Sequence, residues 1–214
     1  MEEGEGGKAL TNIEDFMDFY RRVPRPNMIF SVIGDSDNLI PKPWPKSRFQ
    51  QSLIYAAKAA GECWILSKGE PLTVSKIIRE MMEEHIYLEK AASKSLRLIS
   101  VPSKPVEDTG LYFDLPEVLE DDGDQAKKNQ THQNDSNFVN LSVPSEVEDY
   151  LEFRIKLERT LERPTDKERN ALVVILVEGD LSTVDHVKLA TENGIPVMFV
   201  KGTGGLADLM SISM

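Results

Sequence analysis

The stretch from Ala171 to Met210 constrains the fold of this chain more than any other part of its sequence. It begins with an unbroken, β-branched apolar run, Ala171–Val177, which is typical of a parallel strand covered on both faces. A tight turn and an amphipathic helix follow, and Ile195–Val200 predicts a second strand. Gly202–Gly205 then opens a further helix. The stretch therefore predicts a βαβ unit with a glycine loop at the carboxyl edge of a sheet, where ligands of open α/β folds bind.

The helix inside this unit has recognisable boundaries. Ser182 is predicted to be its N-cap, and Asp185, three residues on, completes a capping-box pattern with negative charge at the helix N-terminus. The pair Asn193-Gly194 is predicted to end the helix. The predicted buried stripe of this helix consists of Val184, Val187 and Ala190.

The acidic composition disfavours several classes of partner. The chain has 214 residues and a formal net charge of -11. Nucleic acids and anionic membrane surfaces both attract clustered Lys and Arg, so neither is an expected partner. No apolar run approaches the ~18 residues of a membrane span, so we expect no direct membrane insertion by this chain. Cys63 is the only cysteine, which excludes an internal disulfide and fits a reducing, cytoplasmic location.

The remaining elements predict a single Rossmann-like α/β domain, a mostly parallel sheet flanked by helices, over residues 26–214. Residues 1–25 are predicted to be a flexible tail with a short helix at Thr11–Arg22. A mobile surface excursion is predicted at residues 102–137, of which Glu120–Ser136 is polar, low in complexity and too hydrophilic to pack. The other predicted strands and helices are Met28–Ile33, Lys46–Ala60, Cys63–Leu66, a helix beginning at Thr73, Leu96–Val101 and Phe138–Val143.

A further helix is predicted from Ser145 to about Leu161, just before the opening stretch. Its exposed face is expected to carry salt-bridged, solvated charges, and Arg154 is assigned to that face together with Glu152 and Arg159. The apolar positions at helical spacing predict the opposite, buried stripe. That stripe consists of Tyr150, Phe153, Leu157 and Leu161.

Four segments, in this order, carry a family resemblance. Pro26–Ser36 is a strand leading into a glycine, and Phe49–Glu80 is a helix, a Trp-containing strand and a glycine loop. Tyr150–Leu161 is similar to a helix with a Glu-Phe-Arg-x-Lys-Leu-Glu core, and the opening stretch contains Val177-Glu178-Gly179 and Gly202–Asp208. Together the segments resemble the cytosolic N-terminal region of melastatin-type transient receptor potential (TRPM) cation channels, which is a Rossmann-like SLOG domain.

This resemblance implies a ligand-sensing and assembly platform of a channel, which in some members binds an ADP-ribose-type nucleotide. It also implies other channel subunits or cytosolic domains as partners, a homo-oligomer, and a place at the cytosolic face of the plasma membrane. The implied ligand-binding residues lie in the glycine loops and are Gly34, Asp35, Ser67, Lys68, Gly69, Gly179, Gly202, Thr203, Gly204 and Gly205.

The glycine loops of this chain depart from the family pattern. Lys68-Gly69 replaces a glycine pair, and Pro71 removes one backbone N–H donor. Asp35 stands where a second glycine is expected, and Gly205 stands where an arginine is common. Two interpretations of Gly202–Gly205 therefore stay open: a phosphate cradle built from backbone N–H groups, or a tight turn that needs positive φ.

The histidines and the common catalytic motifs give no support for an enzyme or a metal site. The sequence contains no nucleophile elbow, Walker loop or HExxH motif, and it lacks the Pro-Gly-Gly-x-Gly-Thr-x-x-Glu signature of related phosphoribohydrolases. His85, His132 and His186 are not at metal-ligand spacing, and His186 is expected to be a solvated surface residue. Asp208 is expected to interact with the dipole of the last helix, and Trp64 to pack in the core.

We therefore predict a non-catalytic regulatory module, with an ADP-ribose-like nucleotide as the candidate ligand and no metal. Two alternatives from other classes remain at this point. One is a small nucleotide N-glycosidase or phosphoribohydrolase-like enzyme of the wider fold family. The other is a degenerate domain retained for protein–protein contact.

Overall fold

The computed structural model describes residues 13–34, 46–69, 73–89, 95–103, 137–141, 149–165 and 167–213. Residues 1–12 of the predicted tail and residues 104–136 of the predicted excursion lie outside these ranges, as do Asp35 and His132. The strands are β1 (Met28–Ile33), β2 (Cys63–Ser67), β3 (Leu96–Ser100), β4 (Phe138–Asn140), β5 (Ala171–Leu176) and β6 (Val197–Phe199). The helices are α1 (Ile13–Arg22), α2 (Lys46–Ala60), α3 (Thr73–Glu89), α6 (Tyr150–Glu162), α7 (Ser182–Glu192) and α8 (Gly205–Ser213).

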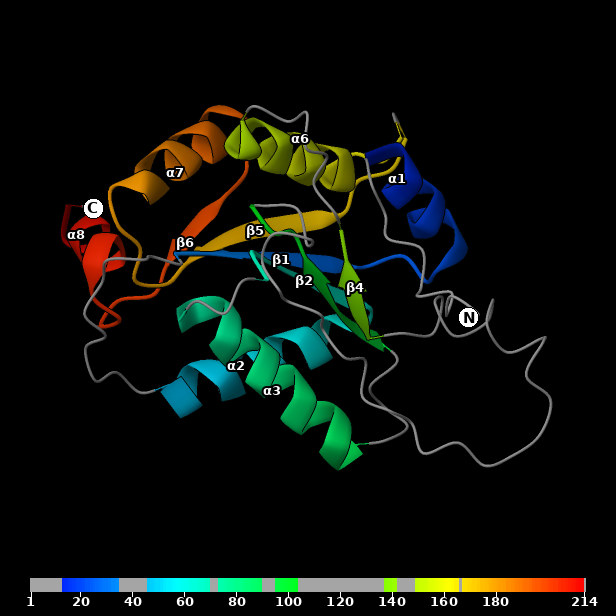
Figure 1. Ribbon diagram of the computed structural model, residues 1–214, viewed down its shortest axis with the longest axis horizontal. Coiled ribbons are helices and arrows are strands. Elements are labelled where there is room, and N and C mark those ends of the chain that lie inside the picture. The colour runs from blue at the N-terminus through cyan, green and yellow to red at the C-terminus, as the bar shows by residue number, and fades with distance from the viewer. Residues whose placement is uncertain are drawn as a thin grey trace, which may run out of the picture.

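The strands form one sheet in the order β4-β3-β2-β1-β5-β6, and every pair within it is parallel. Helices α1, α6 and α7 cover one face, α2 and α3 cover the other, and α8 lies beside β6 (Figure 1). This arrangement confirms the predicted Rossmann-like α/β class. None of the helices in the described ranges is both long and apolar enough to cross a membrane.

The strand order reverses between β1 and β5. Met28 of β1 is in register with Cys63 of β2 on one side and with Ala171 of β5 on the other. The chain runs from β1 through β2 and β3 to β4, and then returns to the other side of β1 as β5 and β6. The carboxyl ends of β1 and β5 therefore meet at the point where open α/β sheets bind ligands.

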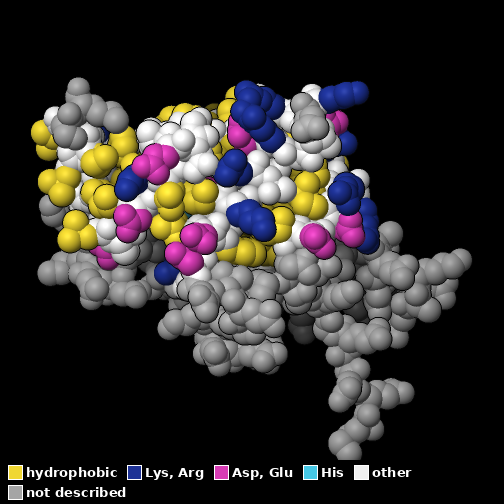
Figure 2. All heavy atoms as spheres, turned by 90° about the horizontal axis from the view of Figure 1, so that it is seen from above, with side chains coloured by type: hydrophobic (Ala, Val, Ile, Leu, Met, Phe, Trp, Pro, Cys, Tyr) yellow, Lys and Arg dark blue, Asp and Glu magenta, His cyan; other side chains and the backbone are white. Residues whose placement is uncertain are grey.

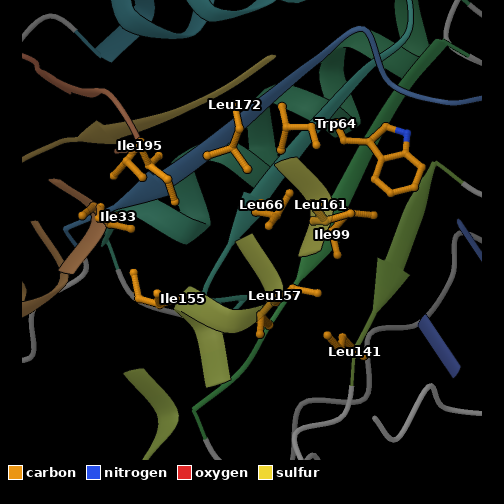
Figure 3. Packing of buried hydrophobic residues seen from close by; sticks show 14 of the residues in the cluster. Ile33, Trp64, Leu66, Ile99, Leu141, Ile155, Leu157, Leu161, Leu172 and Ile195 are labelled. Carbon is orange, nitrogen blue, oxygen red and sulfur yellow. The ribbon is translucent and has the colours of Figure 1, made fainter. Parts of the chain in front are cut away.

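The face under α1 and α6 is packed with aromatic and aliphatic side chains. Trp64, Leu66 and Ile99 project from the sheet toward Leu157 and Leu161 of α6 (Figure 3). The indole ring of Trp64 has no exposed surface, and it packs edge-on against Tyr20 of α1 with the ring centroids 5.4 Å apart. The predicted packing role of Trp64 is confirmed, and the contact ties α1 to the sheet.

The face under α2 and α3 is packed around aliphatic side chains and a single thiol. Ile65 and Cys63 of β2 are fully buried there against Ile78 and Met82 of α3. Because burial disfavours the charged thiolate, the pKa of Cys63 is raised to about 12. Cys63 is therefore a buried, protonated free thiol that acts as a small apolar residue of this core.

Two predicted helix starts are corrected by the caps. The side chain of Asp149 accepts hydrogen bonds from the amides of Leu151 (2.8 Å) and Glu152 (3.2 Å), so α6 begins at Tyr150. The start predicted at Ser145 lies outside the described residues.

In α7, Ser182 is the first helical residue and not the N-cap. The N-cap position is Leu181, whose side chain makes no capping hydrogen bond. Asp180 takes that role, because its Oδ1 accepts from the backbone amide of Ser182 at 2.9 Å. The predicted stripe of α7 is confirmed for Val187 and Ala190, but Val184 is 36% exposed and does not belong to it.

Candidate functional site

The crevice between β1 and β5 is closed by the backbone of the chain itself. Gly34 follows β1, and a Cβ atom at this position would lie 1.8 Å from the carbonyl oxygen of Val177. The amide of Gly179, which follows β5, donates to the carbonyl oxygen of Gly34 at 3.0 Å. Gly34 and Gly179, both among the predicted ligand-binding residues, lie side by side, and their glycine character serves this close backbone contact.

The glycine loop before α8 is packed against the same turn. A Cβ atom at Gly205 would lie 2.2 Å from the carbonyl oxygen of Gly179. The amides of Leu206 and Ala207, in the first turn of α8, donate to the carbonyl oxygens of Gly179 and Glu178, both at 2.9 Å. Free amides at a helix N-terminus would attract a phosphate, but these two are already paired within the chain.

Side chains occupy further polar groups of this loop. The carboxylate of Asp208 accepts a hydrogen bond from the backbone amide of Gly202 at 2.5 Å. The hydroxyl of Thr203 accepts from the amide of Glu178 (2.9 Å) and donates to the carbonyl of Val200 (2.7 Å). Asp208 lies in the first turn of α8, as expected for a residue that interacts with the helix dipole. Its carboxylate is thus the negative charge beside this loop, and it would repel a bound phosphate.

Glu178 has the one left-handed backbone among the described residues other than glycine, with φ of 58°. Its exposed fraction is 1%. Its amide donates to the hydroxyl of Thr203, and its carbonyl oxygen accepts from the amide of Ala207. A residue with a Cβ in this conformation costs of order 1 kcal/mol, and such strain persists only where surrounding contacts fix it. The turn after β5 is therefore fixed by its contacts with the α8 loop.

The loop at the end of β2, residues Ser67–Gly69, differs from the α8 loop; we call it the β2 loop. The hydroxyl of Ser67, a residue only 2% exposed, has no hydrogen-bond partner in the described part of the chain. The amide of Gly69 donates to the hydroxyl of Ser75 on α3 at 3.2 Å. Lys68 lies between them, half-buried, and brings positive charge to this end of the sheet.

A buried polar cluster, which we call the Arg–Glu–His cluster, lies between α6, α7 and β1. Arg154 and Glu158 of α6 are 1% and 0% exposed, and they form an ion pair of 2.9 Å through Nε and Oε1. Arg154 Nη2 donates to the hydroxyl of Ser31 on β1 (2.8 Å), which in turn donates to Glu158 (2.5 Å). His186 Nε2 of α7 lies 3.2 and 3.3 Å from the two carboxylate oxygens of Glu158.

The charges of this cluster keep Glu158 ionised. Burial alone would raise the pKa of Glu158, but His186, Arg154 and the Ser31 hydroxyl together outweigh it and lower the pKa to about 2. An ionised carboxylate only accepts hydrogen bonds, so the Nε2 atom of His186 carries the proton that points at Glu158. The predictions that Arg154 and His186 are solvated were wrong, since both side chains are buried.

A cleft of about 440 Å³ lies at the opposite, amino edge of the sheet. Met28, Leu172 and Ile195 form part of its wall, together with the polar side chains of Arg169 and Asn170. None of the predicted ligand-binding residues lines it. Among the described residues, no group of His, Cys, Asp or Glu side chains has the arrangement of a metal site.

Comparison with known proteins places this geometry in a family. A family model described as SLOG in TRPM matches residues 7–214. The chain belongs to this family. Human transient receptor potential cation channel subfamily M member 5 is 21% identical over 204 residues, 88% of this chain and 17% of that protein. The mouse subfamily M member 2 channel is 26% identical over 200 residues, 87% of this chain and 13% of that protein.

A subfamily M member-like 2 channel of the sea anemone Nematostella vectensis is 24% identical over 207 residues, 88% of this chain and 13% of that protein. This SLOG chain thus spans less than a fifth of the length of the channels it matches. The comparisons confirm the resemblance drawn from the four sequence segments, and they identify the chain as a relative of the N-terminal domain of TRPM channels.

The one signal in the sequence that points to the Arg–Glu–His cluster is the spacing of Arg154 and Glu158. They stand four residues apart within the Glu-Phe-Arg-x-Lys-Leu-Glu core, so both lie on one face of α6. The buried Leu157 and Leu161 lie next to this face of the helix. A charge pair adjoining an apolar stripe is compatible with a buried ion pair, but periodicity alone assigns charges to solvent.

Proposed function

We propose that this SLOG chain is a non-catalytic assembly and regulatory module of a TRPM-type cation channel, placed at the cytosolic face of the membrane. The observation that carries the proposal is an apolar surface at the α7–α8 end, which we call the assembly face. Hydrophobic side chains gather at this end of the molecule, on the left in Figure 2. Its members are Leu181 (82% exposed), Val184 (36%), Leu209 (66%) and Ile212 (75%).

Helix α8 is apolar on both its inner and its outer side. Leu206 and Ala207 are buried against the core, while Leu209 and Ile212, three residues apart, face outward. Polar residues such as Asp208 and Ser211 separate these two apolar sides of the helix, so the outer side is a distinct apolar surface. Exposed apolar groups that gather in this way mark interaction surfaces.

We infer that a second copy of this chain covers the assembly face. Helix α8 lies beside β6, the last strand at this end of the sheet, so the assembly face lies at one end of the molecule. In a two-fold assembly the same patch serves both copies, and an apolar patch is complementary to itself. The sequence resemblance also implies a homo-oligomer.

Size-exclusion chromatography with light scattering over a series of concentrations tests this proposal. We expect the chain to self-associate, and Leu209→Glu combined with Ile212→Glu to give a monomer because two charges would be buried in the interface. Tyr55→Glu on α2 is the matched control, since Tyr55 is 74% exposed on the opposite side of the sheet. A wild-type chain that stays monomeric throughout, or dissociation by Tyr55→Glu as well, would contradict the proposal.

A second candidate function, binding of an ADP-ribose-like nucleotide, is favoured at the β2 loop. The Ser67 hydroxyl has no hydrogen-bond partner in the described residues, and Lys68 supplies a positive charge beside it. The α8 loop is a weaker candidate because its amides at Gly202, Leu206 and Ala207 are paired within the chain. The nucleotide would then lie over the end of β2, with its phosphates near Lys68.

Thermal melting with ADP-ribose tests this second function. A ligand at 100-fold over its Kd stabilises the folded state by roughly 2.7 kcal/mol, so a clear upward shift in Tm is expected. Lys68→Gln should abolish the shift, whereas Lys201→Gln, beside the α8 loop, should leave it unchanged. The absence of any shift at millimolar ADP-ribose would refute binding. An equal loss of the Tm shift in both lysine variants would refute the location of the site at the β2 loop.

The non-enzyme assignment rests on the burial of the reactive groups. Glu158 and His186 are engaged with each other, and burial raises the pKa of the Cys63 thiol to about 12. None of the three offers an accessible base or nucleophile. Incubation with nucleoside monophosphates, followed by chromatography for free base, tests the N-glycosidase alternative, and release of base would overturn the assignment.

A further inference from the structure

The Arg–Glu–His cluster connects two regions to which the proposed function gives separate roles. One end is His186 on α7, the helix that carries Val184 of the assembly face. The other end is Arg154, whose Nη1 atom donates to the carbonyl oxygen of Ser67 at 3.3 Å. Ser67 is the first residue of the β2 loop. The cluster therefore joins α7 to the β2 loop across the carboxyl half of the sheet.

Each link between these ends is a buried, charge-assisted contact. His186 Nε2 approaches both oxygens of Glu158, and Glu158 Oε1 accepts from Arg154 Nε at 2.9 Å. The exposed fraction of each of these three side chains is below 10%. Because little water reaches the cluster, a displaced group leaves its partner unpaired, so movement of one member forces a response in the next.

The β2 loop depends on the carbonyl group that Arg154 holds. The oxygen of Ser67 also accepts from the backbone amide of Val101, at 2.9 Å, just beyond the end of β3. Two residues on, the amide of Gly69 donates to the hydroxyl of Ser75. These two amides, of Val101 and Gly69, report on the position of the loop in the absence of any ligand.

We propose that the Arg–Glu–His cluster couples α7 to the β2 loop, so that displacement of α7 at the assembly face is transmitted to the loop. Glu158 and Arg154 act as positioning residues, since Arg154 acts on the loop through the Ser67 carbonyl. The role of this coupling rests on the proposed function, in which α7 belongs to the assembly face and the β2 loop binds the nucleotide. The contiguous set of buried polar contacts between the two sites supplies the physical route for this coupling, and the exchange experiment below tests whether the loop responds to a change at α7.

Amide hydrogen exchange of the unliganded chain, measured with His186→Gln, tests the coupling. His186 does not contact the β2 loop itself, so any effect on the loop must pass through Glu158 and Arg154. We expect exchange of the Val101 and Gly69 amides to rise by roughly 2- to 30-fold, the range typical of coupled sites. Glu158→Gln should raise the same two rates at least as much, provided that it folds.

Val187→Ala is the matched control, because Val187 is adjacent on α7 and buried but packs only in the apolar cluster. It should raise exchange in α7 and leave Val101 and Gly69 close to wild type. Unchanged exchange at both reporter amides in His186→Gln would overturn the coupling, and so would an equal rise in Val187→Ala. No nucleotide is added, and the exchange is measured at a protein concentration at which light scattering shows a monomer, so the result is independent of whether the proposed function holds.

Discussion

The two faces of the sheet are stabilised in different ways. The face under α6 and α7 has an ion-paired cluster at its centre, with Arg154, Glu158 and His186 held between helices and β1. The face under α2 and α3 is packed around aliphatic side chains and the neutral thiol of Cys63. Both faces are packed with hydrophobic side chains, but only the first adds a buried set of paired charges to that packing, so the two should respond differently to substitution and to pH.

The largest effect should come from removing one partner of the charged cluster. Glu158→Ala leaves the Arg154 guanidinium buried without its counter-charge, and we expect the free energy of unfolding to fall by ~3–5 kcal/mol in urea titration. The double variant Arg154→Leu with Glu158→Leu should cost less than either single leucine substitution, because it leaves no unpaired charge. Additive costs of the two single substitutions would show that the pair is not coupled.

The second effect is a loss of stability in acid that belongs to the α6–α7 face. The pKa of Glu158 is lowered to about 2 in the folded chain, against 4.5 for an exposed glutamate. The unfolded state therefore binds the proton first, and stability is complete above about pH 4.5 and lost as the pH falls toward about 2. The loss is on the order of 3 kcal/mol. Chemical denaturation at several pH values measures it, and Glu158→Gln should flatten the profile.

A smaller effect is expected on the opposite face. Ile78 on α3 has no exposed surface and packs against the aliphatic side chains of that face. Ile78→Val removes one methylene group and should cost ~0.5–1.5 kcal/mol in the same urea titration. The decrement should be the same at pH 3 and at pH 7, since no charge is involved. A decrement that changes with pH would mean that the two faces are not independent.

Periodicity and composition predicted the scaffold closely, because they depend on local sequence. The bounds of β1 and α2 are those predicted, and the order of strands and helices follows the predicted alternation. The glycine positions after β1, β5 and β6 were also identified, but the steric reason for them comes from residues distant in sequence. Gly34, for example, is fixed by the carbonyl of Val177, which no local pattern shows.

The burial of the Arg–Glu–His cluster could not be predicted either, because it also depends on residues distant in sequence. Arg154 and His186 contact partners on other elements, as in the bonds from Arg154 to Ser31 and from His186 to Glu158. An amphipathic pattern places charges toward solvent. The sequence shows that Glu158 can pair with Arg154, but the burial of this pair and its contact with His186 arise only when α6 packs against β1 and α7. The prediction therefore failed where long-range electrostatics overrides local periodicity.

The smallest effect is an alkaline one on the α2–α3 face. The pKa of Cys63 is raised from 9.0 to about 12 by burial, so the unfolded state loses its proton first and stability falls as the pH rises between these values. At pH 9 the loss of stability is only about 0.4 kcal/mol, because the thiol of the unfolded chain is then half ionised. Alkylation should then be slow in the native chain and fast in urea, because only the thiolate reacts. Rapid labelling of the native chain at pH 9 would show instead that this face opens without global unfolding. It would then be less stable against local opening than the face that carries the buried ion pairs.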